Sequence, residues 1–191
     1  MGRMSISIGR RLGEIYDKIP RIAAQARFGL TAEQVVVKFS DLELDVCIPL
    51  DALGDEDAEH VKNVQTKHLP DIRTLGSGLA IEIRYNFNPN DSSRLRKDKQ
   101  LGKLLSDKGY TPVYLVFAEN SPRLADAVSS LRRAGWSFVI GTAALNLMAD
   151  LVGFDVSAIL DEQDVSEEIQ KEINAMMENI KNSDMVKQVF V

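Results

Sequence analysis

The sequence predicts an α/β fold in which a mixed central β-sheet is flanked by helices. Residues 112–117 form a nearly continuous apolar run, which is typical of a central strand that is buried on both faces. Residues 79–85 and 136–140 have the pattern of further strands, and helical patterns separate these three segments. Strands that alternate with helices in this order favour a sheet with helices on its faces.

The N-terminal part is predicted to hold helices followed by strands. Apolar residues recur at helical spacing from Ile6 to Ala26, with an interruption at Pro20 that predicts a kink or two short helices. Thr31-Ala-Glu-Gln indicates a helix start, whereas the β-branched run that follows it, residues 35–39, favours a strand. Apolar and acidic residues alternate over residues 42–48, which predicts a strand with one buried face.

The later segments are predicted to be mainly helical between the strands. We expect an acidic loop at Asp51–Glu59 and an amphipathic helix over Glu167–Val191. Three further helices, each closed by a glycine, are expected over Leu95–Lys108, Pro122–Ala134 and Ala143–Leu151. The interpretation is a single domain over residues 1–191, with N-terminal helices in 1–30, a catalytic α/β core in 31–160 and a C-terminal helix in 161–191.

Composition limits the classes of function. The single cysteine, Cys47, excludes an internal disulfide and disfavours a zinc cluster, and a cytoplasmic location fits best. Neither a signal peptide nor a membrane span is predicted. The net charge is −5, but residues 84–108 hold seven basic residues against three aspartates. An acidic chain can therefore present one basic face to a polyanion, although a basic helix face is more often merely solvated.

Two carboxylates carry the predicted chemistry. Asp71 follows Pro70, and Glu82 interrupts an apolar strand, where an unpaired charge is costly. A glycine-containing hairpin at residues 76–78 would bring Asp71 beside Glu82, on the face that Glu82 shares with Arg84. Such a carboxylate pair is tolerable when Mg²⁺ lies between the two groups, and Mg²⁺ prefers oxygen ligands.

Pro70-Asp71, ten intervening residues and Glu82-Ile83-Arg84 resemble the motif of the PD-(D/E)XK nuclease superfamily. The stretch from about His68 to Leu160 looks like type II restriction endonucleases, loosely those of the ApaLI type. The resemblance implies a restriction-endonuclease-like fold and a Mg²⁺-dependent endonuclease that cleaves double-stranded DNA. It implies that Asp71 and Glu82 are catalytic metal ligands and that Arg84 takes the place of the usual catalytic lysine.

Arg84 departs from the family pattern, because arginine stays protonated and cannot act as a base near neutral pH. It can still clamp a phosphate. Three readings stay open: the enzyme tolerates Arg84, a neighbour such as Lys67 or Lys99 substitutes for the lysine, or this copy is impaired. Glu14 and Glu33 are candidates for a third acid of the metal site, and His60 and His68 for approach to the cleft, although a surface or structural role is the commoner one for such residues.

The segment that follows the motif is the candidate DNA-binding region. Amides there can contact base edges, and basic side chains can contact phosphates. The alternative is a flexible loop that leads into a solvated helix. A homodimer is expected, because a two-fold protein matches a palindromic site. The candidate DNA-binding residues are Asn88, Asn90, Ser92, Ser93, Arg94, Arg96, Lys97 and Lys99.

Other functions remain possible on the sequence alone. A repair or resolvase-type nuclease would share the fold and the metal site. A nuclease-inactive DNA-binding protein would keep the fold and lack the chemistry because of Arg84. An unrelated doubly wound binding protein is a further alternative, but the sequence lacks a glycine-rich phosphate-binding motif that would support it.

Overall fold

The computed structural model describes residues 18–88, 90–118 and 125–153, together with isolated positions between 155 and 178. The chain divides into one compact unit of residues 1–155 and a second of residues 156–191. Every described strand belongs to the first unit. Each helix within the described ranges is too short or too polar to cross a lipid bilayer.

The described part of the chain begins with a helix, which is followed by short helices and strands and by the longer helix α3. Residues 18–28 are helical. The helix α2 (Ala32–Val35) has a capping box, in which Thr31 and Gln34 each accept a hydrogen bond from the other's backbone N–H. The strands β1 (Lys38–Phe39) and β2 (Leu42–Glu43) then form a small antiparallel pair. The strand β3 (Val46–Pro49), the 3-10 helix η1 (Leu50–Ala52) and the helix α3 (Asp55–His68) follow.

The remaining elements alternate between strand and helix, as the sequence predicts. They are β4 (Gly78–Arg84), α4 (Ser92–Asp107), β5 (Tyr110–Val116), α5 (Ala125–Arg132), β6 (Ser137–Ile140) and α6 (Thr142–Val152). Gly153 ends α6 in the left-handed conformation, which glycine adopts without steric cost.

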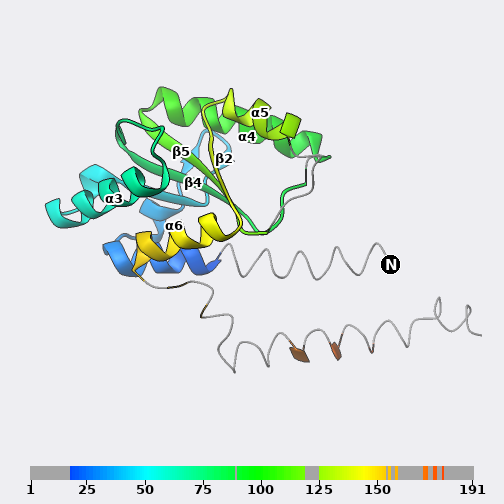
Figure 1. Ribbon diagram of the computed structural model, residues 1–191, viewed down its shortest axis with the longest axis horizontal. Coiled ribbons are helices and arrows are strands. Elements are labelled where there is room, and N and C mark those ends of the chain that lie inside the picture. Colours follow the sequence, from blue (N-terminus) through cyan, green and yellow to red (C-terminus); the bar gives the residue numbers. More distant parts are fainter. Residues whose placement is uncertain are drawn as a thin grey trace, which may run out of the picture. The chain divides into compact units, whose positions relative to one another are not determined.

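The main sheet has the order β3-β4-β5-β6. The strand β3 runs antiparallel to β4, whereas β4, β5 and β6 are mutually parallel. Figure 1 shows this sheet between two helix layers, with α4 and α5 on one side and α3 and α6 on the other. The predicted class, a mixed sheet flanked by helices, is therefore confirmed.

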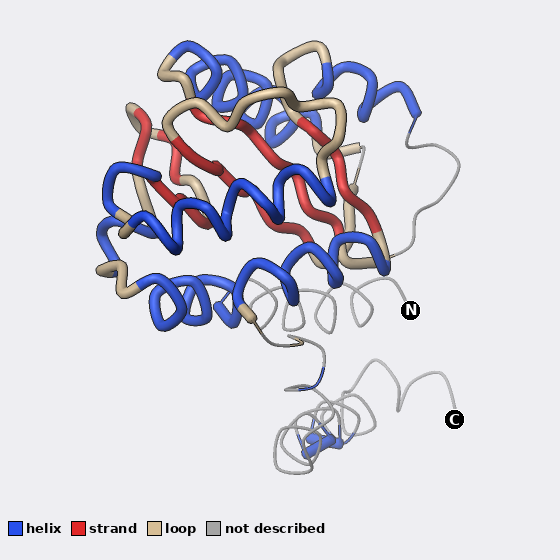
Figure 2. Tube along the Cα trace, turned by 60° about the vertical axis from the view of Figure 1, so that its left-hand side comes forward, coloured by secondary structure: helices blue, strands red, loops and turns tan. Residues whose placement is uncertain are grey.

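The two faces of the sheet are packed by different residues, and Figure 2 shows helices on both faces. Ala80 and Tyr114 belong to a buried cluster with Leu101 and Leu105 of α4 and Leu131 of α5. Because side chains alternate along a strand, Glu82 and Arg84 share the face of Ala80, under α4. The neighbours Ile81 and Ile83 point to the opposite face.

The predicted hairpin before β4 is not formed. The antiparallel partner of β4 is β3, with Val46 opposite Ile81 and Cys47 opposite Ala80. Residues 72–75 belong to no strand, and the whole of α3 separates β3 from β4 along the sequence. The sequence alone favoured the nearest segment as partner, whereas the structure pairs segments that are far apart in the chain.

Two other local expectations were wrong. The acidic run expected as a loop instead enters η1 and the first turns of α3, where Asp55, Glu56 and Asp57 lie at a helix N-terminus and complement its dipole. The single strand expected over residues 42–48 is broken at Leu44 and Asp45 into β2 and β3. Val46, Cys47 and Ile48 are all buried, so β3 lacks the predicted solvent-facing side.

Candidate functional site

The candidate site lies toward the carboxyl end of β4. Glu82 and Arg84 lie among the last three residues of this strand, and the described residues 85–88, 90 and 91 lie between it and α4. Asp91 caps α4, since its side chain accepts a hydrogen bond from the backbone N–H of Arg94. In sheets of parallel strands, ligands commonly bind beyond the carboxyl ends of the strands, so this position favours a binding site.

Glu82 lies beside a second carboxylate that the sequence did not single out. Asp45 directly precedes β3, and its Oδ2 accepts a hydrogen bond from the backbone N–H of Ile83, 2.8 Å away. The other oxygen, Oδ1, lies 2.6 Å from Nη2 of Arg21. Only 3% of Glu82 is exposed. Two adjacent strands therefore hold two buried acids side by side.

Asp98 of α4 brings a third buried acid to the same place. Its Oδ2 accepts a hydrogen bond of 2.9 Å from the hydroxyl of Tyr114, on β5. Its backbone carbonyl accepts one of 2.7 Å from Nε1 of Trp136. These two contacts attach α4 to the sheet. We call Asp45, Glu82 and Asp98 the acidic cluster.

The guanidinium of Arg84 lies within the acidic cluster. It pairs with Glu82 Oε1, lies 3.2 Å from Asp45 Oδ2 and lies 3.8 Å from Asp98 Oδ1. A second arginine, Arg94, places Nη2 3.4 Å from the same Glu82 oxygen. The other oxygen, Oε2, is buried and has no hydrogen-bond partner among the described residues. Oε1 of Glu82 thus has two arginine partners, whereas Oε2 has no hydrogen-bond partner among the described residues.

These surroundings change the protonation equilibria of the acidic cluster. Burial raises the pKa of Glu82 to about 8, and Arg84 and Arg94 oppose this rise while Asp45 and Asp98 add to it. Burial also raises the pKa of Asp98, against the effects of Arg84 and of the hydrogen bond from Tyr114. Glu82 and Asp98 therefore retain a proton at a higher pH than exposed carboxylates do.

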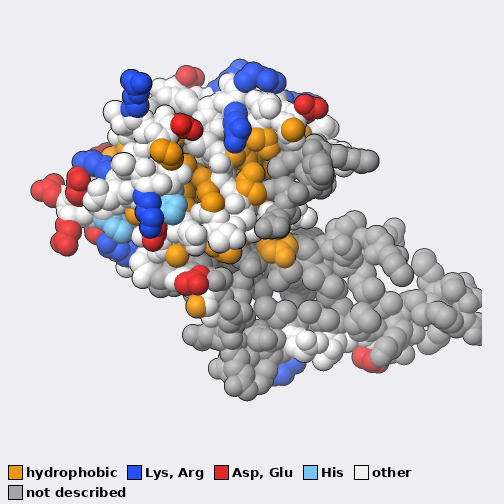
Figure 3. All heavy atoms as spheres, in the orientation of Figure 1, with side chains coloured by type: hydrophobic (Ala, Val, Ile, Leu, Met, Phe, Trp, Pro, Cys, Tyr) orange, Lys and Arg blue, Asp and Glu red, His pale blue; other side chains and the backbone are white. Residues whose placement is uncertain are grey.

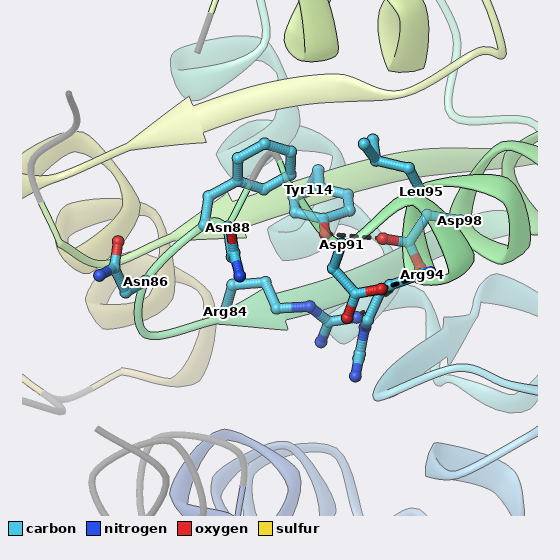
Figure 4. Close-up of a pocket in the computed structure, with 9 residues that line it drawn as sticks. Arg84, Asn86, Asn88, Asp91, Arg94, Leu95, Asp98 and Tyr114 are labelled. Atoms are coloured by element: carbon cyan, nitrogen blue, oxygen red, sulfur yellow. Dashed lines mark hydrogen bonds and ion pairs between the residues drawn. The ribbon is translucent and has the colours of Figure 1, made fainter. Parts of the chain in front are cut away.

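Two hollows open beside the cluster. The larger hollow, of about 410 Å³, is lined by Glu82, Asp98, Arg94 and Lys97, together with three further acids. The smaller hollow, of about 180 Å³, is lined by Arg84, Arg94 and the rings of Phe87 and Tyr114. Figure 4 shows Arg84 and Arg94 converging beside the smaller hollow. The three further acids of the larger hollow are Asp41, Glu43 and Asp91.

Four of the candidate DNA-binding residues line these hollows, and the other four do not. Asn88 lines the smaller hollow and is exposed, and its Oδ1 accepts a hydrogen bond from the backbone N–H of Asn90. Ser92 is the first residue of α4, and Ser93, Arg94 and Lys97 line the larger hollow. Arg96 is exposed on α4 and Lys99 is partly buried there. The structure thus brings Asn88, Ser93, Arg94 and Lys97 to the hollows, whereas Ser92, Arg96 and Lys99 lie elsewhere on α4.

Asp71 lies elsewhere. It is exposed in the turn that follows α3, and it lines a third hollow, of about 350 Å³, with His68, Arg132 and Ser137. Ser137 begins β6, which is an edge strand and is separated from β4 by β5. The structure places Asp71 and Glu82 at different hollows, and the groups that shift the pKa of Glu82 do not include Asp71. The carboxylate that the structure brings beside Glu82 is Asp45.

The other candidates from the sequence have separate surroundings. Nε2 of His60 is 3.1 Å from the carbonyl oxygen of Leu151, and Nε2 of His68 is 2.6 Å from Oδ2 of Asp150. Lys67 binds the same Asp150 oxygen. Glu33 is exposed on α2. Glu14 lies outside the described residues.

A signal for one of the missed residues is present in the sequence. Asp98 occurs on the apolar stripe of α4, three residues after Leu95 and three before Leu101, where a solvated residue does not belong. Asp45 gives no such signal, because Glu43 and Asp45 alternate with apolar residues as in a strand with one exposed face. A charged residue at a core position indicates a partner or a function.

A divalent cation such as Mg²⁺ requires oxygen ligands, and the acidic cluster contains carboxylate oxygens. No group of three or more His, Cys, Asp or Glu side chains in the described ranges is arranged to hold a metal ion. Mg²⁺ nevertheless needs only one or two protein carboxylates, since water and substrate phosphate supply its other ligands. Glu82 and Asp98 line the larger hollow, and the buried Oε2 of Glu82 has no hydrogen-bond partner among the described residues. The donor set therefore fits Mg²⁺ through these two residues, with Asp45 beside them.

No protein-family model, curated protein or solved structure matches the chain. The geometry of Glu82, Arg84 and the neighbouring acids therefore carries the functional proposal, together with the resemblance of the motif.

Proposed function

We propose that the protein is a Mg²⁺-dependent endonuclease that hydrolyses phosphodiester bonds of double-stranded DNA, with a sequence-specific restriction enzyme as the preferred form. The observation that carries the proposal is the carboxylate of Glu82, which is buried, unsatisfied at Oε2 and adjacent to Asp45 and Asp98. A buried, unsatisfied acid oxygen is costly in a purely structural role. A cation in the larger hollow would relieve that cost.

Under this proposal, the residues around the hollows would have separate roles in binding the metal ion and the DNA. Glu82 and Asp98 would hold Mg²⁺, which supplies Lewis acidity toward the scissile phosphate. Arg84 keeps the carboxylates of Glu82 and Asp45 in place and contributes positive charge near the phosphate. Lys97 and the first turn of α4 would contact the DNA backbone.

A second candidate is a nuclease-inactive DNA-binding protein of the same fold. The observation that favours it is the position of Arg84, whose guanidinium already contacts all three acids of the cluster. A permanent cation there compensates the acids without a metal ion. Under this alternative the DNA-binding surface is retained and hydrolysis is lost.

A cleavage assay distinguishes the two candidates. The protein is incubated with plasmid, phage and four-way-junction DNA, with Mg²⁺ or with EDTA. We expect discrete fragments that require Mg²⁺, and we expect Glu82→Gln to lower the rate by roughly a hundredfold or more, as loss of a metal-site residue does. Preference for the junction would identify a resolvase-type nuclease instead. Binding without cleavage supports the inactive candidate, for which Arg84→Lys is the rescue test.

Matched carboxylate variants then test whether cleavage depends on the acidic cluster or on Asp71. Asp45→Asn and Asp71→Asn remove the same charge from different places. The structure predicts that Asp45→Asn impairs cleavage and that Asp71→Asn leaves it close to wild type. Loss of cleavage in Asp71→Asn alone would support the metal pair predicted from the sequence. If the wild-type protein neither cuts nor binds duplex DNA with Mg²⁺ present, the endonuclease proposal fails.

A further inference from the structure

Arg94 stands where the two hollows meet. It is the one arginine that lines both of them, among the residues that border these hollows. Its side chain is 51% exposed, whereas the side chain of Arg84 is 15% exposed. Its backbone is fixed by the cap at Asp91, but the long side chain extends beyond that cap toward Glu82. Arg94 can therefore reach both the buried acid and the solvent.

The contact between Arg94 and Glu82 is loose. The distance from Nη2 to Oε1 is 3.4 Å, and Oε1 is also paired with Arg84. Arg84 is held by three acids, so it is committed to the cluster. The Arg94 end of this pair is solvated and its Glu82 oxygen is already satisfied by Arg84, so a stronger anion can replace the contact. A DNA phosphate is such an anion, because it offers arginine two charge-assisted hydrogen bonds.

We propose that Arg94 is a positioning residue that couples DNA binding to cation binding. In the free protein its charge lies against Glu82 and opposes the entry of a divalent cation. A DNA phosphate draws the guanidinium away from Glu82 and neutralises it, and the cation then binds more tightly. Linkage makes the effect reciprocal, so the cation strengthens DNA binding by the same factor. The inference rests on the proposed function and adds the order in which the site is completed.

The first test is cation binding without DNA. Mn²⁺ is titrated by calorimetry into the full-length wild-type protein and into Arg94→Ala, Arg94→Lys, Glu82→Gln and Lys103→Ala. Lys103 is an exposed residue of α4 that borders neither hollow, so its variant removes one positive charge from the same helix. We expect Arg94→Ala to bind Mn²⁺ about fivefold more tightly, the effect of one partly exposed charge. Arg94→Lys and Lys103→Ala should stay close to wild type.

The second test is the coupling itself. Binding of a short DNA duplex is followed by fluorescence anisotropy with and without Ca²⁺, which takes the same oxygen ligands. The Kd for DNA without Ca²⁺, divided by the Kd with Ca²⁺, should exceed one for the wild type and approach one for Arg94→Ala. This ratio is independent of the direct loss of a phosphate contact.

The outcomes separate the inference from the proposed function. If Glu82→Gln weakens Mn²⁺ binding but Arg94→Ala leaves it unchanged or weaker, the coupling role of Arg94 is overturned and the metal site stands. If Glu82→Gln has no effect on Mn²⁺ binding, the cation does not use Glu82 and both proposals fall.

Discussion

At the scale of single residues, Glu82 is placed where burial and charge oppose each other. The strand β4 removes its carboxylate from water, and Asp45 and Asp98 add negative charge nearby. Arg84 and Arg94 supply the opposite charge, yet both act at Oε1 and leave Oε2 unsatisfied. The result is an acid whose proton is held more tightly than in water, a condition that is common at functional sites.

This position predicts how stability depends on pH. The pKa of Glu82 is raised from 4.5 to about 8 in the folded protein. Between these values the folded state holds a proton that the unfolded chain has released, so the free energy of unfolding falls as the pH rises through this window. Glu82→Gln keeps the shape and cannot ionise, so its stability should vary less. Urea unfolding of both proteins from pH 5 to 8.5 measures the difference, and parallel curves would contradict it.

Part of the candidate site could be predicted from the sequence, residue by residue. Glu82 and Arg84 are predictable, because a charge within an apolar strand is visible in the sequence. Asp45 was missed because its partner is Ile83, 38 residues away, and nothing in the sequence indicates that β3 pairs with β4. The expectation for Asp71 assumed a local hairpin, and the structure replaces that hairpin with a long-range pair.

At the scale of elements, α4 is the helix that links the acidic cluster to the surface. Its inner face carries Asp98, which is tied to β5 through Tyr114 and to the start of β6 through Trp136. Its first turn carries Arg94 and faces the larger hollow. The position of the basic side chains therefore depends on the buried contacts of the same helix.

Tyr114→Phe tests that link. The substitution removes the donor to Asp98 Oδ2 and leaves the ring, which stacks on Phe138 with centroids 4.7 Å apart, in place. A buried acceptor without its donor costs about 1–3 kcal/mol, so we expect a loss of stability of that order. Denaturant unfolding measures it, and a double-mutant cycle with Asp98→Ala is the control. An equal effect of Tyr114→Phe in both backgrounds would show that the hydrogen bond is not the cause.

The sequence predicted the elements of the core better than those before it. The strands β4 and β5 are buried over almost their whole length and mainly apolar because helices cover both faces of the sheet, and this pattern predicts strands clearly. The start of α3 was missed because acids read as loop residues, although the same acids stabilise a helix N-terminus. The break at Asp45 depends on contacts with Arg21 and Ile83 that only the folded chain provides.

At the scale of the whole molecule, charge is distributed unevenly. The chain carries a net charge of −5. Figure 3 shows Lys and Arg side chains over the side of the molecule where α4 and α5 lie, and acidic side chains gathered over α3. On the face that this view shows, a polyanion would be attracted more strongly near α4 and α5 than near α3. Under the proposed function, this difference would orient DNA toward α4.

The salt dependence of DNA binding tests this arrangement. Each phosphate contact contributes about −0.9 to the slope of log K against log salt for duplex DNA. Lys97→Ala should therefore weaken binding and make the slope shallower by about one. The matched control is Lys62→Ala, which removes the same charge from α3, where Lys62 pairs with Glu59. Fluorescence anisotropy between 50 and 200 mM salt, a range over which such slopes are resolved, gives both values. Equal slopes for the two variants would contradict DNA contact through α4, because a uniform loss of positive charge would then explain the binding without an oriented surface.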